Sequence, residues 1–297
     1  MLATVLIANY NHGSFLADAI DSALGQTHPE VEVVVVDDGS TDGSRDVIAS
    51  YGREVVALLQ ENRGQAGAVN AGFEVSRGEI VCLLDADDLF HEDKVARVVQ
   101  AYRGHASVVH HRMQALSPDG SPIGRPAPRT AISGEIGDRV RRAGGWWPHP
   151  LTSGLSFPRW YLAQVMPIPV VSPRLFADTY LAAPAPFFGP VIGLPAVLAH
   201  NRVHASNIWT TAVIGPDQLG QRLDRLELEH AVLLETLDRC GKHVELRSAR
   251  HLQLAQYRWA AGADGSALAA VLAGLRCPTL PWPMKWRHLA RLALRRW

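Results

Sequence analysis

The sequence predicts an α/β fold: a Rossmann-like, mostly parallel sheet flanked by helices and followed by a helical C-terminal extension. The first observation is a set of short apolar runs rich in β-branched residues, which are typical of buried parallel strands. These runs lie at residues 4–8, 31–36, 55–59 and 80–84. The second observation is helical spacing of apolar residues, at about residues 15–24, 42–51 and 65–76 and again from residue 95. Strands that alternate with helices indicate right-handed βαβ units and a parallel sheet.

The rest of the chain is less regular. Residues 107–116 predict a strand, and the turn Pro118-Asp119-Gly120 predicts that the chain returns as a hairpin. Residues 121–150 are rich in Gly, Pro and Arg and predict a mobile loop. From about Pro216 onward, leucines and alanines spaced three and four apart predict helices. We therefore expect one α/β domain over residues 1–214 and a helical extension over residues 215–297.

Composition narrows the class of protein. Of the 297 residues, 47% are apolar, which suits a globular protein with a large core. The 29 basic residues balance 29 acidic ones, so the overall charge gives no reason to expect nucleic-acid binding. The cysteines Cys82, Cys240 and Cys277 are far apart and lack metal-ligand spacing, which predicts free thiols in a reducing, cytoplasmic setting.

One uncharged stretch, residues 181–199, is long enough to cross a bilayer. It holds four prolines and two glycines, so a helix there would leave backbone hydrogen bonds unmade. We predict that it is not a membrane span. The chain also runs from Met1 directly into a strand, which predicts no signal peptide.

Polar residues gather where three of the predicted strands end. The clusters are Asn9-Tyr10-Asn11, Asp37-Asp38-Gly39-Ser40 and Asp85-Ala86-Asp87-Asp88. Ligands of open parallel sheets bind beyond the carboxyl ends of the strands, so the three clusters predict one site. Turn and cap chemistry explains the segment from Ser40 to Asp42, but not three clusters on one edge.

The predicted site is strongly acidic. Carboxylates at such range repel one another unless a cation or hydrogen-bond donors stabilise them. Oxygen ligands select a hard divalent ion such as Mg²⁺ or Mn²⁺, which usually completes its shell with ligand phosphates.

These clusters, together with segments further along the chain, resemble the family 2 glycosyltransferases. The matching runs are Ala8–Asn11, Val36–Asp42, Asn62–Gly72, Asp85–Asp88, Thr152–Leu155, Ala177–Leu181 and Asn201–Asn207. The resemblance covers about residues 3–207. It implies a GT-A fold, with residues 1–214 as the catalytic domain, and an enzyme that moves a sugar from a nucleotide-sugar to an acceptor hydroxyl with inversion of the anomeric centre.

The resemblance also implies roles for particular residues in the donor site. Asp38 would hydrogen-bond the nucleotide base, and Ala8 and Asn9 would line the same pocket. Asp85-Ala86-Asp87 resembles the family's DXD motif, in which Asp85 would contact the ribose or join the metal shell and Asp87 would bind Mn²⁺ or Mg²⁺. Asp88 is interpreted as a helix cap or a supporting group. The other residues assigned to the nucleotide are Asn11, Asn62, Gly64, Asn70, Ala86 and Arg202.

Asp178 is the predicted catalytic base, because it occupies the position of the family's acceptor-side acidic motif. The preceding Ala177 replaces the usual acidic residue, and an ordinary place on a helix surface is the alternative. A base is needed because the acceptor hydroxyl loses its proton as it attacks. His204 lies in a segment similar to Tyr-Arg-x-His, with Asn201 in place of the tyrosine. It would reach the metal or the diphosphate, or else serve only the fold.

The acceptor side is less well marked. The resemblance assigns Ser153 and Gly154 to it. Trp147 would stack on an acceptor sugar or, equally, pack in the core. Residues 256–259 hold one residue fewer than the Gln-x-x-Arg-Trp motif of processive family members, so we predict one sugar transferred per encounter.

The last segment predicts an amphipathic helix. Its apolar face would carry Trp286, Leu289, Ala290, Ala293 and Trp297, with Arg287, Arg291 and Arg295 directed away from it. This pattern is typical of a helix in a membrane interface, which would suit a peripheral enzyme at the inner face of the membrane. The alternative is a helix packed on the domain with its arginines in water.

Two other functions are compatible with parts of the pattern. A nucleotidyltransferase would carry a Gly-rich basic loop after the first strand, where this chain has Asn9-Tyr10-Asn11-His12. An inactive nucleotide-sugar-binding protein would have no use for Asp178. A UDP-sugar is the first expectation for the donor, with GDP- and dTDP-linked sugars open. The expected acceptor is a carbohydrate or a lipid-linked molecule, in polysaccharide or glycolipid assembly.

Overall fold

The computed structural model describes residues 1–102, 104–170, 176–204, 216–261, 267–280, 282 and 284–286. The chain forms two compact units. Unit 1 comprises residues 1–134 and 149–207, and unit 2 comprises residues 135–148 and 208–297. The predicted boundary at residue 214 lies outside the described residues.

Unit 1 holds the sheet and most of the short helices. Its strands are β1 (Ala3–Asn9), β2 (Val31–Asp38), β3 (Val56–Gln60), β4 (Ile80–Asp85), β5 (Leu89–Phe90), β6 (Val108–Leu116), β7 (Pro122–Ala127), β8 (Leu155–Pro158) and β9 (Val191–Arg202). Its helices are α1 (Gly13–Leu24), α2 (Ser44–Ser50), α3 (Gly64–Val75), α4 (Lys94–Ala101), α6 (Arg159–Val165) and α7 (Ala177–Ala182), with 3₁₀ turns η1 (Thr152–Gly154) and η2 (Ala185–Phe187).

The strands of the described residues form one mixed sheet with the order β3-β2-β1-β4-β8-β6-β9-β5, and β7 pairs with β6. Strands β3, β2, β1 and β4 are parallel neighbours, and β6 and β9 are also parallel. The remaining pairings, of β8, β5 and β7 with their neighbours, are antiparallel and short. Most paired residues therefore lie in parallel ladders, as the βαβ pattern predicts.

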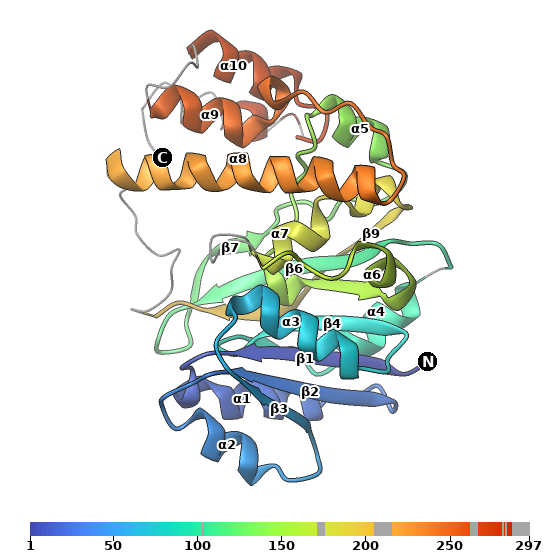
Figure 1. The fold of residues 1–297 in the computed structure, drawn as a ribbon, viewed down its shortest axis with the longest axis vertical. Coiled ribbons are helices and arrows are strands. Elements are labelled where there is room, and N and C mark those ends of the chain that lie inside the picture. The colour runs from blue at the N-terminus through green and yellow to red at the C-terminus, as the bar shows by residue number, and fades with distance from the viewer. Residues whose placement is uncertain are drawn as a thin grey trace. The chain divides into compact units, whose positions relative to one another are not determined.

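Helices cover both faces of the sheet (Figure 1). Side chains of one face, such as Val5 and Val33, pack with Leu16 and Ile20 of α1 and with Val95 of α4. The opposite face packs against α3, mainly through Val34, Val36 and Ala68. Because the strands are buried on both sides, they read in the sequence as continuous apolar runs rather than as alternating ones.

The expected elements of the first hundred residues are all present, and so is the β6–β7 hairpin. The expectation of a mobile loop over residues 121–150 was wrong. This segment contains β7 and the helix α5 (Gly137–Arg142). Helix α5 carries three arginines in its last turn and one buried residue, Val140, so its apolar signal was too short to read.

Unit 2 is helical, as expected of the C-terminal region. Its described residues form α5, α8 (Pro216–Arg239), η3 (Ser248–Arg250), α9 (Leu252–Ala260) and α10 (Ala267–Arg276). One apolar cluster joins Ala143 after α5 to Leu252 of α9 and Ala273 of α10, with Trp146 packed against it. The Arg139 guanidinium also donates to the carbonyl of Pro278. Residues 135–148 of the Gly-, Pro- and Arg-rich segment are therefore part of a helical core.

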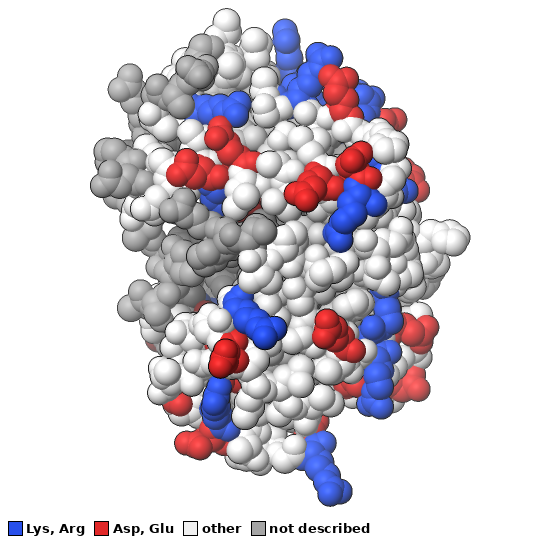
Figure 2. All heavy atoms as spheres, viewed as in Figure 1, with Lys and Arg blue, Asp and Glu red and all other residues white. Residues whose placement is uncertain are grey.

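None of the described helices is long and apolar enough to cross a membrane. The uncharged stretch at residues 181–199 instead forms the end of α7, η2 and most of β9, as its prolines and glycines predict. Acidic and basic side chains are interspersed on the face shown in Figure 2, in keeping with the balanced overall charge.

Candidate functional site

Three neighbouring strands bring the predicted polar clusters to one edge of the sheet. Strand β1 lies between β2 and β4, with Asn9 opposite Asp37 and Ala8 opposite Asp85. All three strands run in the same direction, so their carboxyl ends meet at this edge. The sequence prediction of one shared edge is confirmed.

At the end of β2, two buried aspartates are held by donors of the protein itself. Asp37 accepts hydrogen bonds from the side chains of Asn9 and Arg45 and from the backbone N–H of Ser40. Burial alone would raise the pKa of Asp37, but these hydrogen bonds hold the pKa below its usual value. Asp37 is therefore a satisfied structural anion.

Asp38 lies beside a turn that only glycine permits. Gly39 has a φ of +81°, and a Cβ there would lie 2.7 Å from the backbone nitrogen of Asn62. This close approach lets the Gln60 side chain and the Arg63 N–H donate to Oδ1 of Asp38, at 2.6 and 2.9 Å. Among the described residues no hydrogen bond to Oδ2 of Asp38 is found, so this oxygen could accept a hydrogen bond from a ligand.

At the end of β4, carboxylates crowd one another. Burial raises the pKa of Asp85 well above its usual value, and repulsion from Asp88, Asp87 and Asp178 raises it further. Burial and the neighbouring Asp87 raise the pKa of Asp88 to about 7. Four carboxylates from two separate segments therefore converge at this strand end.

Asp88 is a fully buried supporting group rather than a helix cap. It accepts hydrogen bonds from the Ser153 hydroxyl at 2.6 Å, the Asn201 amide at 3.0 Å and the Arg202 N–H at 3.3 Å. The Ser153 hydroxyl oxygen in turn accepts the backbone N–H of Asp85. Asp88 and Ser153 thus fasten the loop after β4 to η1 and to the end of β9.

Arg202 braces the same loop from the end of β9. Its guanidinium donates to the carbonyls of Asp87 and Phe15 and to the carboxylate of Asp18. It also lies over the Phe15 ring, 5.0 Å from the centroid. These contacts hold the first turn of α1 against the DXD-like loop. The predicted binding of phosphate by Arg202 stays a prediction.

Asp178 lies in the first turn of α7, close enough to Asp85 to repel it. Gln65 of α3 links these two places, because its amide donates to Asp85 Oδ1 at 3.1 Å and its carbonyl accepts the N–H of Ala177 at 3.3 Å. The backbone N–H of Thr179 donates to Asp178 Oδ1. Gln65 therefore positions the start of α7 relative to the DXD-like segment.

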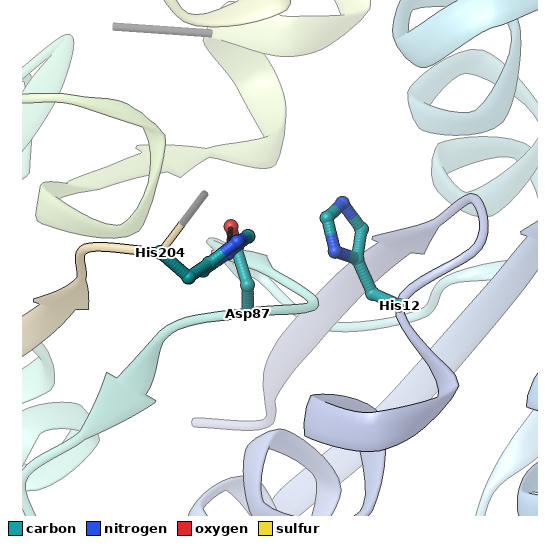
Figure 3. Close-up of side chains that lie close together, drawn as sticks. All are labelled: His12, Asp87 and His204. Atoms are coloured by element: carbon teal, nitrogen blue, oxygen red, sulfur yellow. Dashed lines mark hydrogen bonds and ion pairs between the residues drawn. The ribbon is translucent and has the colours of Figure 1, made fainter. Parts of the chain in front are cut away.

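A histidine and an aspartate from the predicted metal set meet at the same edge. The Nε2 of His204 lies 2.9 Å from Oδ2 of Asp87. Figure 3 shows that His12, from the loop between β1 and α1, extends toward this pair. The ligand atoms of His12, Asp87 and His204 all lie within 4.8 Å of one another. Two imidazoles and a carboxylate among further carboxylates form a donor set that suits a divalent cation.

Asp85 is not a member of this three-residue cluster. Its oxygen accepts a hydrogen bond from Gln65, and its role as a metal ligand stays a prediction.

Several predicted site residues occupy supporting positions. The Asn70 amide exchanges two hydrogen bonds with the backbone of Ile168, and so fixes the chain just after α6. The Asn9 amide binds Asp37 and Ser40 and is 1% exposed. Ala86 is 2% exposed and belongs to the core. Asn11 fixes the neighbouring turn, because its Oδ1 accepts the N–H of Thr41.

The residues predicted to bind the acceptor are also buried. Ser153 is fully buried and its hydroxyl is used by Asp85 and Asp88, so it supports the carboxylates instead. A Cβ on Gly154 would lie 2.5 Å from Pro150, so this glycine serves close packing. Trp147 is 2% exposed, which favours core packing over stacking on a sugar. Ala8 lies near the end of β1, opposite Asp85, and the Asn62 side chain accepts the N–H of Gly64 at the start of α3.

Sequence reasoning missed three residues of this site. His12 and Phe15 lie just after the Asn9-Tyr10-Asn11 cluster, and Gln65 opens α3. The position of His12 and Phe15 beyond a parallel strand end was a usable signal. Gln65 carried none, because nothing in its local pattern distinguishes it from an exposed helix residue.

Comparison with known proteins gives this fold and site a family. Residues 4–149 match the family described as Glycosyl transferase family 2. An uncharacterized glycosyltransferase of Nostoc sp. (strain PCC 7120) is 34% identical over 260 residues, which cover 85% of this chain and 81% of that protein.

Two solved structures share the fold. S. aureus TarS 1–349 in complex with UDP-GlcNAc superposes with a TM-score of 0.60 at 16% identity, covering 100% of this chain and 93% of that one. The mannosyltransferase PcManGT from Pyrobaculum calidifontis, in complex with GDP-Man and Mn²⁺, gives 0.52 at 22% identity, covering 99% and 86%. The fold predicted from the sequence, GT-A with a helical C-terminal region, is confirmed.

Proposed function

We propose that this chain, which belongs to glycosyl transferase family 2 and is a glycosyltransferase, transfers one sugar per encounter from a nucleoside-diphosphate sugar to an acceptor hydroxyl. The proposed transfer inverts the anomeric centre and uses a divalent ion. The observation that carries this proposal is the convergence of Asp85, Asp87, Asp178 and His204 on the sheet edge that also holds Asp38. Polysaccharide or glycolipid assembly is the proposed setting.

The donor base would lie against the end of β2. Oδ1 of Asp38 is fixed by Gln60 and the Arg63 N–H, which orients Oδ2 toward a ring N–H of the base. We propose a UDP-sugar as the donor, and the UDP-GlcNAc bound by TarS supports this choice. PcManGT binds GDP-Man, so a GDP-sugar is the alternative donor, and titration with UDP and GDP distinguishes the two.

The diphosphate would lie near Asp87 and His204. The side chains of both residues are only slightly exposed, at 13% and 11%, and a nearby cation would stabilise a carboxylate that lies among other carboxylates. When bound, a Mn²⁺ or Mg²⁺ ion would offset the negative charge that develops on the leaving diphosphate. The protein contributes a fixed geometry, because Arg202 and Asp88 hold the loop that carries Asp87.

Asp178 would accept the proton of the acceptor hydroxyl. Its position at the start of α7 is set by Gln65, which also contacts Asp85. Among the described residues, its Oδ2 has no hydrogen-bond partner, so this oxygen is available to a hydroxyl. A base on the acceptor side opposes the leaving group on the donor side, as inversion by direct displacement requires.

Asp178→Asn tests the base directly. We expect kcat to fall about 10²- to 10⁴-fold, the usual contribution of a positioned base, while the affinity for nucleotide stays unchanged. Asp138→Asn is a matched control, because Asp138 is likewise the second residue of a six-residue helix, α5. Equal transfer by Asp178→Asn and by the wild type would refute the assignment of the base. If the wild type binds the donor but transfers sugar to none of the acceptors tested, the result favours an inactive nucleotide-sugar-binding protein.

A second proposal concerns the C-terminal segment, which we infer contacts an anionic membrane surface. Trp282 and Trp286 are 61% and 58% exposed and pack edge to face, with their ring centroids 5.9 Å apart. Residues 265–297 contain six Lys and Arg and no Asp or Glu, in a chain without net charge. Exposed tryptophans beside basic residues favour the interface of an anionic bilayer. The remainder of the predicted helix, residues 287–297, lies outside the described residues.

Vesicle sedimentation tests this contact. We expect binding to phosphatidylglycerol-containing vesicles at least about tenfold stronger than to phosphatidylcholine vesicles, since each basic residue contributes about 1 kcal/mol. A chain ending at Pro281 and the pair Trp282→Ser with Trp286→Ser should lose this binding. Leu59→Ser, at a residue 56% exposed in unit 1, is the control and should keep it. Equal binding by the tryptophan variant would overturn the proposal.

A further inference from the structure

We infer that His12 is a third protein ligand of the divalent ion and that it makes the site prefer transition-metal ions over Mg²⁺. The inference rests on the proposed metal-dependent function and adds a residue and an ion class to it. It begins from the cluster in Figure 3, in which the ligand atoms of His12, Asp87 and His204 lie within 4.8 Å of one another. Ligands about 2.0–2.2 Å from a shared ion reach this spacing with small side-chain movements.

The loop that carries His12 is fixed by its neighbours. Asn11 adopts a φ of +57° and its side chain accepts the N–H of Thr41, which ties the loop to the turn after β2. The N–H of Gly13 donates to Asp42 in the same turn. The carbonyl of His12 accepts the N–H groups of Phe15 and Leu16, so its backbone forms the start of α1. The imidazole therefore extends from a rigid base.

The second imidazole is held by the same helix. The Phe15 ring stacks on His204, with the ring centroids 4.5 Å apart and an interplanar angle of 25°. Arg202 joins Phe15 and Asp18 of α1 to the carbonyl of Asp87. His12 and His204 then meet edge to face with their centroids 5.9 Å apart. One assembly of α1, β9 and the loop after β4 thus fixes all three candidate ligands.

The His12 ring has no competing role within the described part of the chain. Its contacts there are with the rings of Phe15 and His204, and no hydrogen bond to it is found among those residues. A half-buried imidazole that faces a carboxylate and a second imidazole is placed as a metal ligand would be.

The donor atoms decide which ions the site prefers. Mg²⁺ favours oxygen ligands, whereas imidazole nitrogen favours first-row transition ions. A site with one histidine and carboxylates would discriminate weakly between the two classes. A second imidazole adds affinity for Mn²⁺ and, more strongly, for Co²⁺, and adds little for Mg²⁺. Three protein ligands also leave room in a six-coordinate shell for ligand oxygens.

Calorimetric titration of the full chain with Co²⁺, Mn²⁺ and Mg²⁺, without nucleotide, tests this inference. We expect the wild type to bind Co²⁺ and Mn²⁺ more tightly than Mg²⁺. His12→Asn should weaken Co²⁺ binding at least about tenfold, since even residues behind the ligands contribute 10- to 100-fold. Its affinity for Mg²⁺ should stay within about twofold. His105→Asn, at an exposed histidine outside the cluster, is the control and should match the wild type.

The outcomes separate this inference from the proposed function. If Asp87→Asn abolishes Co²⁺ binding while His12→Asn binds Co²⁺ like the wild type, His12 is not a ligand and the metal-dependent function stands. If the wild type binds none of the three ions and transfers sugar in EDTA, the metal-dependent function itself fails. The Co²⁺ absorption bands give an independent readout, because loss of an imidazole ligand shifts their position, whereas partial unfolding lowers their intensity without shifting the bands of the protein that stays folded.

Discussion

Strands β2 and β4 flank β1 in one sheet and both end in closely spaced aspartates, yet the two ends differ in how their charges are stabilised. At the end of β2, Asp37 is surrounded by donors from Asn9, Ser40 and Arg45, and its pKa is lowered despite burial. At the end of β4, burial and neighbouring carboxylates raise the pKa values of Asp85 and Asp88.

The difference indicates what each end is for. A buried anion with a full set of protein donors stabilises the fold and has no need of a ligand. A group of carboxylates that repel one another costs stability and is tolerated where a cation or substrate supplies the missing charge. On this basis we propose that β2 contributes structure and an oxygen that would face the nucleotide base, and that β4 contributes the reactive side of the site.

The largest expected effect separates the two ends by activity. Asp87→Asn should lower kcat at least about 10³-fold, since a bound metal contributes several kcal/mol to the transition state. Asp37→Asn should mainly lower the free energy of unfolding, by about 1–3 kcal/mol, because it leaves buried donors unpaired. Transfer assays and urea unfolding of both variants measure the contrast. If Asp87→Asn and Asp37→Asn lose similar stability and retain similar activity, the end of β4 does not differ from the end of β2 in function.

A smaller effect compares two buried serines, one at each end. Ser153→Ala removes a donor to the fully buried Asp88 and an acceptor for the Asp85 N–H, and should cost about 1–3 kcal/mol of stability. Ser40→Ala removes acceptors for the Asn9 amide and the Asn11 N–H, and should cost about 1 kcal/mol. We expect Ser153→Ala to lower kcat more than Ser40→Ala does, because it loosens the loop that carries Asp87. A larger loss of kcat in Ser40→Ala would contradict this assignment.

The smallest effect concerns pH. The pKa of Asp37 is lowered from 3.8, so its contribution to stability is present above that pH and is lost as the pH falls through the folded-state pKa. Arg45→Met should raise that pKa, so the loss begins at a higher pH. Because the Arg45 side chain is 47% exposed, we expect less than about 1 kcal/mol at pH 7. Urea unfolding from pH 2.5 to 7 measures the shift. If the free energy of unfolding falls identically at acid pH in the variant and the wild type, Arg45 does not lower the pKa of Asp37.

Much of unit 1 could be predicted because its signals are local. Continuous apolar runs located β1, β2 and β4, and the position of each polar cluster after a run located the site edge. The meeting of Asp178 with the DXD-like segment followed only from the family resemblance. No spacing in the sequence relates the start of α7 to β4, since Gln65 makes the link across the fold.

Other features depend on contacts that no local pattern records. His12 becomes a candidate ligand only because α1 and the end of β9 are joined through Arg202. The segment 135–148 is held in unit 2 by distant partners, since the Thr279 hydroxyl donates to the carbonyl of Trp146 and the His230 ring bonds to the carbonyl of Gly144. A segment rich in Gly, Pro and Arg reads as a loop until such distant partners are known.

Calorimetric titration of UDP, GDP and dTDP, each with Mn²⁺ and with EDTA, tests the central claim most directly. We expect one nucleotide to bind in Mn²⁺ and to lose most of its affinity in EDTA and in Asp87→Asn, while Asp178→Asn binds it like the wild type. Binding of that nucleotide with equal affinity in Mn²⁺ and in EDTA, or no binding of any of the three by the folded protein, would contradict a metal-dependent donor site at the end of β4.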